Sequence, residues 1–145
     1  MFLFKTRVIL VIALGLAVFV ACAPKKEVKK QPAPVTKKSE LKVTKTTLTT
    51  GVKNRQPIDS VIVFPDSIGR VYCWTLIQGA KKPTVIKHIW HYGKREMAET
   101  SLEVKTPRYR TWSYKTILPH WKGDWRVWIV DSQGNLLGTA SFKIK

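Results

Sequence analysis

The sequence predicts an all-β fold, an immunoglobulin-like antiparallel β-sandwich of about seven or eight strands that follows a signal peptide and a disordered linker. From about Leu41 onwards, β-branched and aromatic residues dominate the chain, and these residue types are enriched in strands. Turn residues interrupt them at short intervals, and apolar and polar residues alternate between the turns. No segment beyond the N-terminal region has the apolar spacing of an amphipathic helix.

Each predicted strand is bounded by turn residues. In chain order the strands are expected at Val43–Leu48, Ser60–Phe64, Val71–Gln78, Val85–Tyr92, Met97–Val104, Arg110–Leu118, Trp125–Asp131 and Leu136–Ile144. The breaks between them fall at Pro65 to Gly69, Gly79 to Pro83, Gly93 to Arg95, Pro107, Pro119 to Gly123 and Ser132 to Asn135.

The alternation of residues assigns faces to several strands. Val71–Gln78 is apolar on both faces, which is typical of a central strand. In the last strand one face carries apolar or small residues, and the Gly134-Asn135 turn before it predicts a hairpin with the preceding strand. The residues of that face are Leu136, Gly138, Ala140, Phe142 and Ile144.

Two strands carry tryptophans whose orientation matters for function. In Arg110–Leu118, Trp112 and Tyr114 share a face, and we expect Trp112 to lie in the core, as we also expect of Trp74. In Trp125–Asp131, Trp125 shares its face with Val127 and Ile129, so Trp128 is expected to point outwards.

The N-terminus has the layout of a bacterial lipoprotein precursor. Lys5 and Arg7 precede an apolar run, which ends in Phe19-Val20-Ala21-Cys22. The run from Val8 to Val20 is shorter than the about 20 residues of a spanning helix. We therefore predict a signal peptide at 1–21, lipidation of Cys22, and a protein anchored in the bilayer of the cell envelope on its periplasmic or surface side. The alternative is an uncleaved N-terminal helix that extends past Ala23.

Residues 22–42 are predicted to be a tether, because lysine pairs and prolines fill this stretch and no apolar periodicity is present. Residues 43–145 are predicted to form the folded domain. The whole chain has a formal charge of +17, which favours anionic partners such as lipid headgroups, acidic envelope polymers or nucleic acid. A solvated basic surface without a specific partner is the alternative.

Tryptophans and other aromatic residues recur at a specific spacing within residues 71–144. The segments concerned are Val71-Tyr72-Cys73-Trp74-Thr75, Gly79-Ala80, Pro83 to Ile86, His88 to Tyr92, Met97, Pro107 to Ser113, Lys115 to Pro119, Trp121 to Val127, Asp131 and Gly134. In these residues the stretch resembles the DUF2914 family, a family of bacterial domains without an established function. The resemblance supports the β domain and the envelope setting, and the family offers no catalytic residues to carry over.

The sequence offers little that would support catalysis or metal binding. His88 and His91 are three residues apart, so on one strand they point to opposite faces and cannot chelate one ion together. If Cys22 is lipidated, Cys73 has no partner in the chain, and a lone thiol in a strand is usually a small buried hydrophobic group. We therefore expect no enzymatic activity, no metal and no cofactor.

The remaining aromatic and basic residues predict a binding module. Candidate ligand contacts are Trp90, Arg108, Trp121, Arg126 and Trp128, because outward aromatic rings beside cationic groups stack on sugars or anchor protein interfaces. The favoured partner is an envelope glycan such as peptidoglycan or an acidic polysaccharide, and an envelope protein is the alternative. The same composition suits nucleic acid, but the lipoprotein signal argues against it. These rings could instead cover the edges of a small domain.

Overall fold

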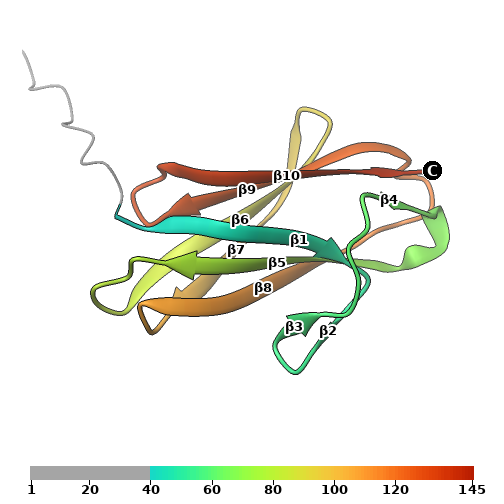
Figure 1. Ribbon diagram of the computed structural model, residues 1–145. Helices are drawn as coiled ribbons and strands as arrows, with labels where there is room; N and C mark the ends of the chain where they lie inside the picture. The colour runs from blue at the N-terminus through green and yellow to red at the C-terminus, as the bar shows by residue number, and fades with distance from the viewer. Residues whose placement is uncertain (1–39) are drawn as a thin grey trace, which may run out of the picture. The chain divides into compact units, whose positions relative to one another are not determined.

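The computed structural model describes residues 40–145, in which two larger β-sheets pack face to face (Figure 1) and a third, two-stranded sheet forms a small hairpin. The predicted signal peptide, Cys22 and residues 22–39 of the predicted tether lie outside the described residues. The first strand begins one residue before the predicted domain. The strands are β1 Lys42–Thr49, β2 Val52–Lys53, β3 Gln56–Pro57, β4 Val63–Phe64, β5 Arg70–Gln78, β6 Thr84–Tyr92, β7 Arg95–Val104, β8 Arg108–Thr116, β9 Gly123–Asp131 and β10 Leu136–Ile144.

The strand order is that of an immunoglobulin-like sandwich. One sheet has the order β1-β5-β8 and the other β4-β10-β9-β6-β7. Strands β1, β5 and β8 occupy the places of A, B and E in the immunoglobulin fold, and β6, β9 and β10 those of C, F and G. All pairings are antiparallel except that of β4 with β10. The predicted fold class is therefore confirmed.

The short segments between β1 and β5 differ most from the prediction. The predicted strand Ser60–Phe64 is reduced to β4, and a small hairpin, β2–β3, forms where no strand was expected. Its two turn residues, Asn54 and Arg55, both have positive φ (50° and 60°). Such a turn usually contains glycine. Because Arg55 takes its place, the sequence lacks the pattern from which this hairpin would be predicted. A short 3-10 turn, Asp66–Ile68, leads into β5.

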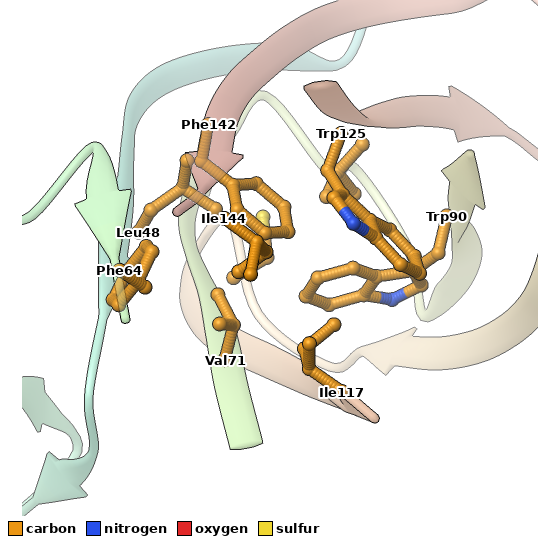
Figure 2. Packing of buried hydrophobic residues seen from close by; sticks show 10 residues of the cluster. Leu48, Phe64, Val71, Trp90, Ile117, Trp125, Phe142 and Ile144 are labelled. Carbon is orange, nitrogen blue, oxygen red and sulfur yellow. The ribbon is translucent and has the colours of Figure 1, made fainter. Parts of the chain in front are cut away.

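In the larger core cluster, aromatic residues of the five-stranded sheet pack against Leu48, Val71 and Cys73 of the three-stranded sheet (Figure 2). The Phe142 ring stacks on Trp125 with a centroid distance of 5.8 Å and meets Trp90 edge-on at 6.2 Å. Trp90 on β6 packs in the same cluster as Cys73 on β5 and Val127 on β9. In antibody domains the corresponding strands bring a tryptophan against the disulfide. A second cluster around Ile77, Ile86, Val104 and Ile129 fills the end of the sandwich near residue 41.

Hydrogen-bonded polar side chains lie between the sheets. The fully buried His88 ring is hydrogen-bonded through Nδ1 to Ser113 Oγ (2.9 Å) and through Nε2 to Thr75 Oγ1 (3.1 Å). The Trp90 indole Nε1 donates to the same Ser113 oxygen (3.1 Å). Because Ser113 and Thr111 of β8 face the core, the expectation that Trp112 and Tyr114 face inwards is wrong, and both lie on the outer side of the sheet.

The other face assignments agree with the prediction at most positions. Trp125, Val127 and Ile129 are buried, and Trp128 points outwards with 38% of its surface exposed. The β9–β10 hairpin forms as expected, and the Asp131 carboxylate accepts hydrogen bonds from the backbone N–H groups of Gln133 and Asn135. Leu136 is exposed, contrary to expectation, because the strand register shifts between Leu136 and Gly138.

The thiol of Cys73 is fully buried, as expected for a small hydrophobic group. Burial raises its pKa to about 12, so the thiol stays protonated at neutral pH. Since the thiolate is the reactive form of cysteine, we expect this side chain to serve packing rather than chemistry.

Stability is expected to fall in mild acid because of His88. Burial lowers the pKa of this imidazole to about 4 from its usual 6.5, so the unfolded chain binds a proton that the folded domain excludes. The free energy of unfolding is therefore highest above about pH 6.5 and declines as the pH falls. At pH 4 it is lower by about 3 kcal/mol. Urea titrations between pH 7 and 4 should show this loss for the native protein and a smaller loss for His88→Gln. Equal losses for the two proteins would contradict the assignment.

Candidate binding face

The predicted contact residues do not form one site. Trp90 is fully buried, so it has no surface to offer a ligand. Trp121 is half-buried in the loop before β9, where its ring packs against Trp125 and lies under the Lys115 ammonium group. Arg126 and Trp128 lie on the outer face of the five-stranded sheet, whereas Arg108 begins β8 in the other sheet.

Trp128 has a mixed-charge environment. Its ring contacts His91 at a centroid distance of 4.5 Å with a tilt of 45°, and the buried Nδ1 of His91 has no hydrogen-bond partner within residues 40–145. In the register of β6, His91 is opposite Arg126 of β9 and Glu96 of β7. A little farther along the same face, Lys87 pairs with Glu99 at 2.7 Å. One exposed indole among charges of both signs is weak support for a glycan groove.

A larger aromatic surface lies on the outer side of the three-stranded sheet. Tyr72 of β5 is opposite Tyr114 of β8, and Trp74 is opposite Trp112. The two tyrosine rings are 5.5 Å apart. Tyr114 is 51% exposed, Tyr72 and Trp112 are half-buried, and Trp74 is buried. We call Tyr72, Trp112 and Tyr114 the aromatic face.

The β2–β3 hairpin lies beside the three-stranded sheet (Figure 1) and is hydrogen-bonded to the buried Trp74. The Trp74 indole Nε1 donates to the Arg55 carbonyl oxygen at 3.0 Å, and Arg55 Nη2 donates to the Arg110 carbonyl oxygen at 3.2 Å. The hairpin therefore has a defined place on the sheet, and the aromatic face is the part of the sheet beside it.

The loop that carries the hairpin is closed by Asp59. Its carboxylate accepts hydrogen bonds from the Thr49 hydroxyl (2.6 Å), the Thr50 backbone N–H (2.9 Å) and the Thr50 hydroxyl. Desolvation alone would raise the pKa of this carboxyl, but the hydrogen bonds from Thr49 and Thr50 outweigh it and hold the pKa below its usual value. The charged carboxylate thus ties the end of β1 to the end of the loop.

Arginines surround the aromatic face. The Arg70 guanidinium lies over the Tyr114 ring at 4.9 Å, and Arg55 lies over the Tyr109 ring at 5.0 Å. Arg108 and Arg110 are the first and third residues of β8, and with Arg55 they line a hollow of about 290 Å³.

These arginines are not neutralised within the domain. The ion pairs of residues 40–145 all use lysines: Lys81–Glu40, Lys87–Glu99, Lys105–Glu103, Lys122–Asp66 and Lys143–Asp124. The outward positions of β5 and β8 contain no acidic residue. The three-stranded sheet therefore presents aromatic rings flanked by unpaired positive charge, which suits a ligand with a flat apolar side and anionic groups.

The alternate positions of arginines and aromatic residues in the β8 sequence could have identified this face. Arg108 and Arg110 are separated by even steps from Trp112 and Tyr114, so all four share one side of a regular strand. Arginine is almost never fully buried without a partner. The side that carries two arginines is therefore the better candidate for the outer side, despite its aromatic residues.

Residues 40–145 were also searched for metal-ligand groups and for membrane-spanning helices. No group of three or more histidine, cysteine or acidic side chains in residues 40–145 is placed to hold a metal ion. No helix in this part of the chain is long and apolar enough to span a membrane.

The fold and the face together define an immunoglobulin-like β-sandwich domain with an aromatic and basic outer surface. Within this class, residues 83–144 match the DUF2914 family, whose description is a protein of unknown function. This match confirms the resemblance for residues 83–144, from the beginning of β6 to the end of β10, and leaves residues 71–82 outside it. A search of curated proteins finds no match to the chain.

Removing the Asp59 carboxylate is expected to loosen the loop beneath the hairpin. Asp59→Ala should lower the free energy of unfolding at pH 7 by about 1–2 kcal/mol, since several charge-assisted hydrogen bonds are lost. Asp66→Ala is the matched control, because it removes a carboxylate whose lysine partner is largely exposed and should cost less. Thermal unfolding of both variants measures the difference, and equal losses would contradict the role of Asp59.

Proposed function

We propose that this protein is a lipoprotein of the cell envelope and that its domain is a non-enzymatic binding module for an acidic glycan. The observation that carries the proposal is the aromatic face, where Tyr72, Trp112 and Tyr114 lie among arginines that have no acidic partner within residues 40–145. Aromatic rings stack on the apolar side of sugars, and guanidinium groups form paired hydrogen bonds with carboxylates and phosphates. Binding accounts for both features without any catalytic group.

This proposal moves the ligand contacts to the three-stranded sheet. Of the residues predicted from the sequence, Arg108 is kept as a contact. Trp90 is excluded by its burial, and Trp121, Arg126 and Trp128 lie away from the aromatic face. The proposed contacts are Arg70, Tyr72, Arg108, Arg110, Trp112 and Tyr114.

The N-terminal sequence supports the envelope setting. We propose that cleavage after Ala21 exposes Cys22, that lipid attached there holds the protein in the bilayer, and that the lysine-rich tether carries the domain towards the wall. The basic tether and the basic face would then both lie near anionic polymers or headgroups. In this compartment a polysaccharide is a more plausible polyanion than nucleic acid.

The second candidate function is protein–protein interaction within an envelope complex. It is favoured by the outer face of the five-stranded sheet, where Trp128 is exposed against His91. An exposed indole of this kind can anchor an interface. This face and the aromatic face are on different sheets, so substitutions separate the two functions.

Binding is expected to depend on the aromatic face. Mature protein in detergent should co-sediment with purified cell-wall sacculi or bind a polyuronic acid in calorimetry. Tyr114→Ala or Trp112→Ala should weaken binding about tenfold, the effect of one lost aromatic contact. Trp128→Ala is the matched control and should bind normally.

The reverse pattern, with loss in Trp128→Ala and normal binding in Tyr114→Ala, would favour the protein-interaction face. Absence of binding to sacculi and to the acidic polymer would contradict the proposed function.

Membrane anchoring is expected to require Cys22. The Cys22→Ser precursor should keep its signal segment, lack lipid by mass spectrometry and lose the mature anchored form from the membrane fraction. Cys73→Ser tests whether the effect is specific to the first cysteine, because the buried Cys73 should not affect anchoring. Unchanged mass and anchoring of the Cys22→Ser protein would show that the lipoprotein assignment is wrong.

A further inference from the structure

A hollow lined by three arginines lies where the tip of the β2–β3 hairpin meets the beginning of β8. It has a volume of about 290 Å³, and its walls are Arg55, Thr106, Arg108, Tyr109 and Arg110. We propose that this hollow is an anion subsite that receives a carboxylate or phosphate group of the bound glycan. The identity of the polymer rests on the proposed function, but the anion subsite can be tested separately.

The structure holds one of the three guanidinium groups in place. Arg55 Nη2 donates to the Arg110 carbonyl oxygen (3.2 Å), and the same guanidinium lies over the Tyr109 ring (5.0 Å). The Trp74 indole fixes the backbone of Arg55 through its carbonyl oxygen. A guanidinium has five N–H donors, so most of those on Arg55 remain available. A side chain that is already placed loses less entropy when it binds a ligand.

Arg55 also has a backbone conformation that disfavours its side chain type. Its φ of 60° follows the φ of 50° at Asn54, and glycine is the usual residue at such a turn position. An arginine in this left-handed conformation is strained relative to glycine. The Arg55 side chain contacts the Arg110 carbonyl oxygen and the Tyr109 ring at the hollow, and glycine could not make these contacts.

The charges around the hollow are unbalanced. Arg55, Arg108 and Arg110 take part in no ion pair within residues 40–145, and the acidic residue nearest to Thr106 in the sequence, Glu103, pairs with Lys105 at 3.2 Å. Three neighbouring guanidinium groups repel one another unless an anion lies between them. Carboxylates and phosphates match the planar fork of arginine better than other anions do.

The position of the hollow favours a polymer over a small anion. Arg108, Arg110, Trp112 and Tyr114 follow one another at alternate positions on the outer side of β8. Six residues of extended strand span about 20 Å. A chain along β8 would therefore stack on the rings of Trp112 and Tyr114 and place an acidic group among the arginines at its end.

The test compares a charged polymer with its neutral counterpart. Binding of a polyuronic acid and of the same polymer with reduced carboxyl groups is measured for the mature protein in detergent. We expect the charged polymer to bind at least about tenfold more tightly, as one lost bidentate pair would imply. The double variant Arg108→Ala/Arg110→Ala should bind both polymers with the weaker affinity, and Tyr114→Ala should weaken both. Arg126→Ala, on the other sheet, should match the native protein.

Equal binding of the two polymers, unaffected by the double variant, would overturn the subsite and leave the proposed function intact. Binding of anionic lipid vesicles through the same arginines, with no binding of the polymer, would overturn the assignment to a glycan. The variants keep the Arg110 carbonyl that Arg55 contacts, and an unchanged melting temperature confirms their folding.

A titration with inorganic phosphate tests the subsite even if neither polymer binds. Saturable shifts of the side-chain Nε–Hε resonances confined to Arg55, Arg108 and Arg110 would support an anion subsite. Small unsaturable shifts spread over all arginines would overturn it.

Discussion

The hydrogen bonds of the Ser113 hydroxyl decide which face of β8 is turned towards the core. This oxygen bonds both the His88 ring and the Trp90 indole across the space between the sheets. If β8 were turned over, Ser113 would leave the core and these buried nitrogens would lose their partner, at a cost of about 1–3 kcal/mol for each unpaired group. Trp112, Tyr114 and the arginines of β8 face outwards as a consequence.

The two sheets differ in the charges that they present. The outer side of the five-stranded sheet carries Glu96, Glu99 and Asp124 beside its basic residues, and Lys87 and Lys143 pair with two of these acids. The outer side of β5 and β8 carries arginines and aromatic rings. A positive field from one face attracts polyanions and orients them before contact. The lysines of the predicted tether would add to the same attraction, and salt would weaken it.

The sequence was sufficient to predict the regular parts of the domain. The long strands, the β9–β10 hairpin and the outward position of Trp128 followed from residue types with a period of two. The β2–β3 hairpin was missed because its turn contains Asn54 and Arg55 instead of glycine. The orientation of β8 differs from the prediction because tryptophan and tyrosine are typical core residues, whereas the core at this strand uses Ser113 to satisfy His88. That pairing joins residues far apart in the sequence, so local alternation could not predict it.

The predicted ligand contacts also divide into residues that the fold exposes and residues that it buries. Trp90 is not available as a ligand contact, because its ring is fully buried and packs edge-on against Phe142 in the core. Arg108 is exposed, which a ligand contact requires, whereas Trp112 on the same side of β8 was expected in the core and lies on the outer side. The orientation of β8 follows from Ser113, which is the hydrogen-bond partner of the buried His88. With Ser113 facing the core, the side of the strand that carries Arg108 faces outwards.

Hydroxyl-radical footprinting of the mature protein, with and without a polyuronic acid, tests this arrangement most directly. In the free protein Trp112 and Tyr114 should oxidise readily, whereas the buried Trp90 and Trp125 should remain unmodified. The polymer should then protect Trp112 and Tyr114 and leave the oxidation of Trp128 unchanged. Slow oxidation of Trp112 and Tyr114 in the free protein, or protection confined to Trp128, would contradict the account.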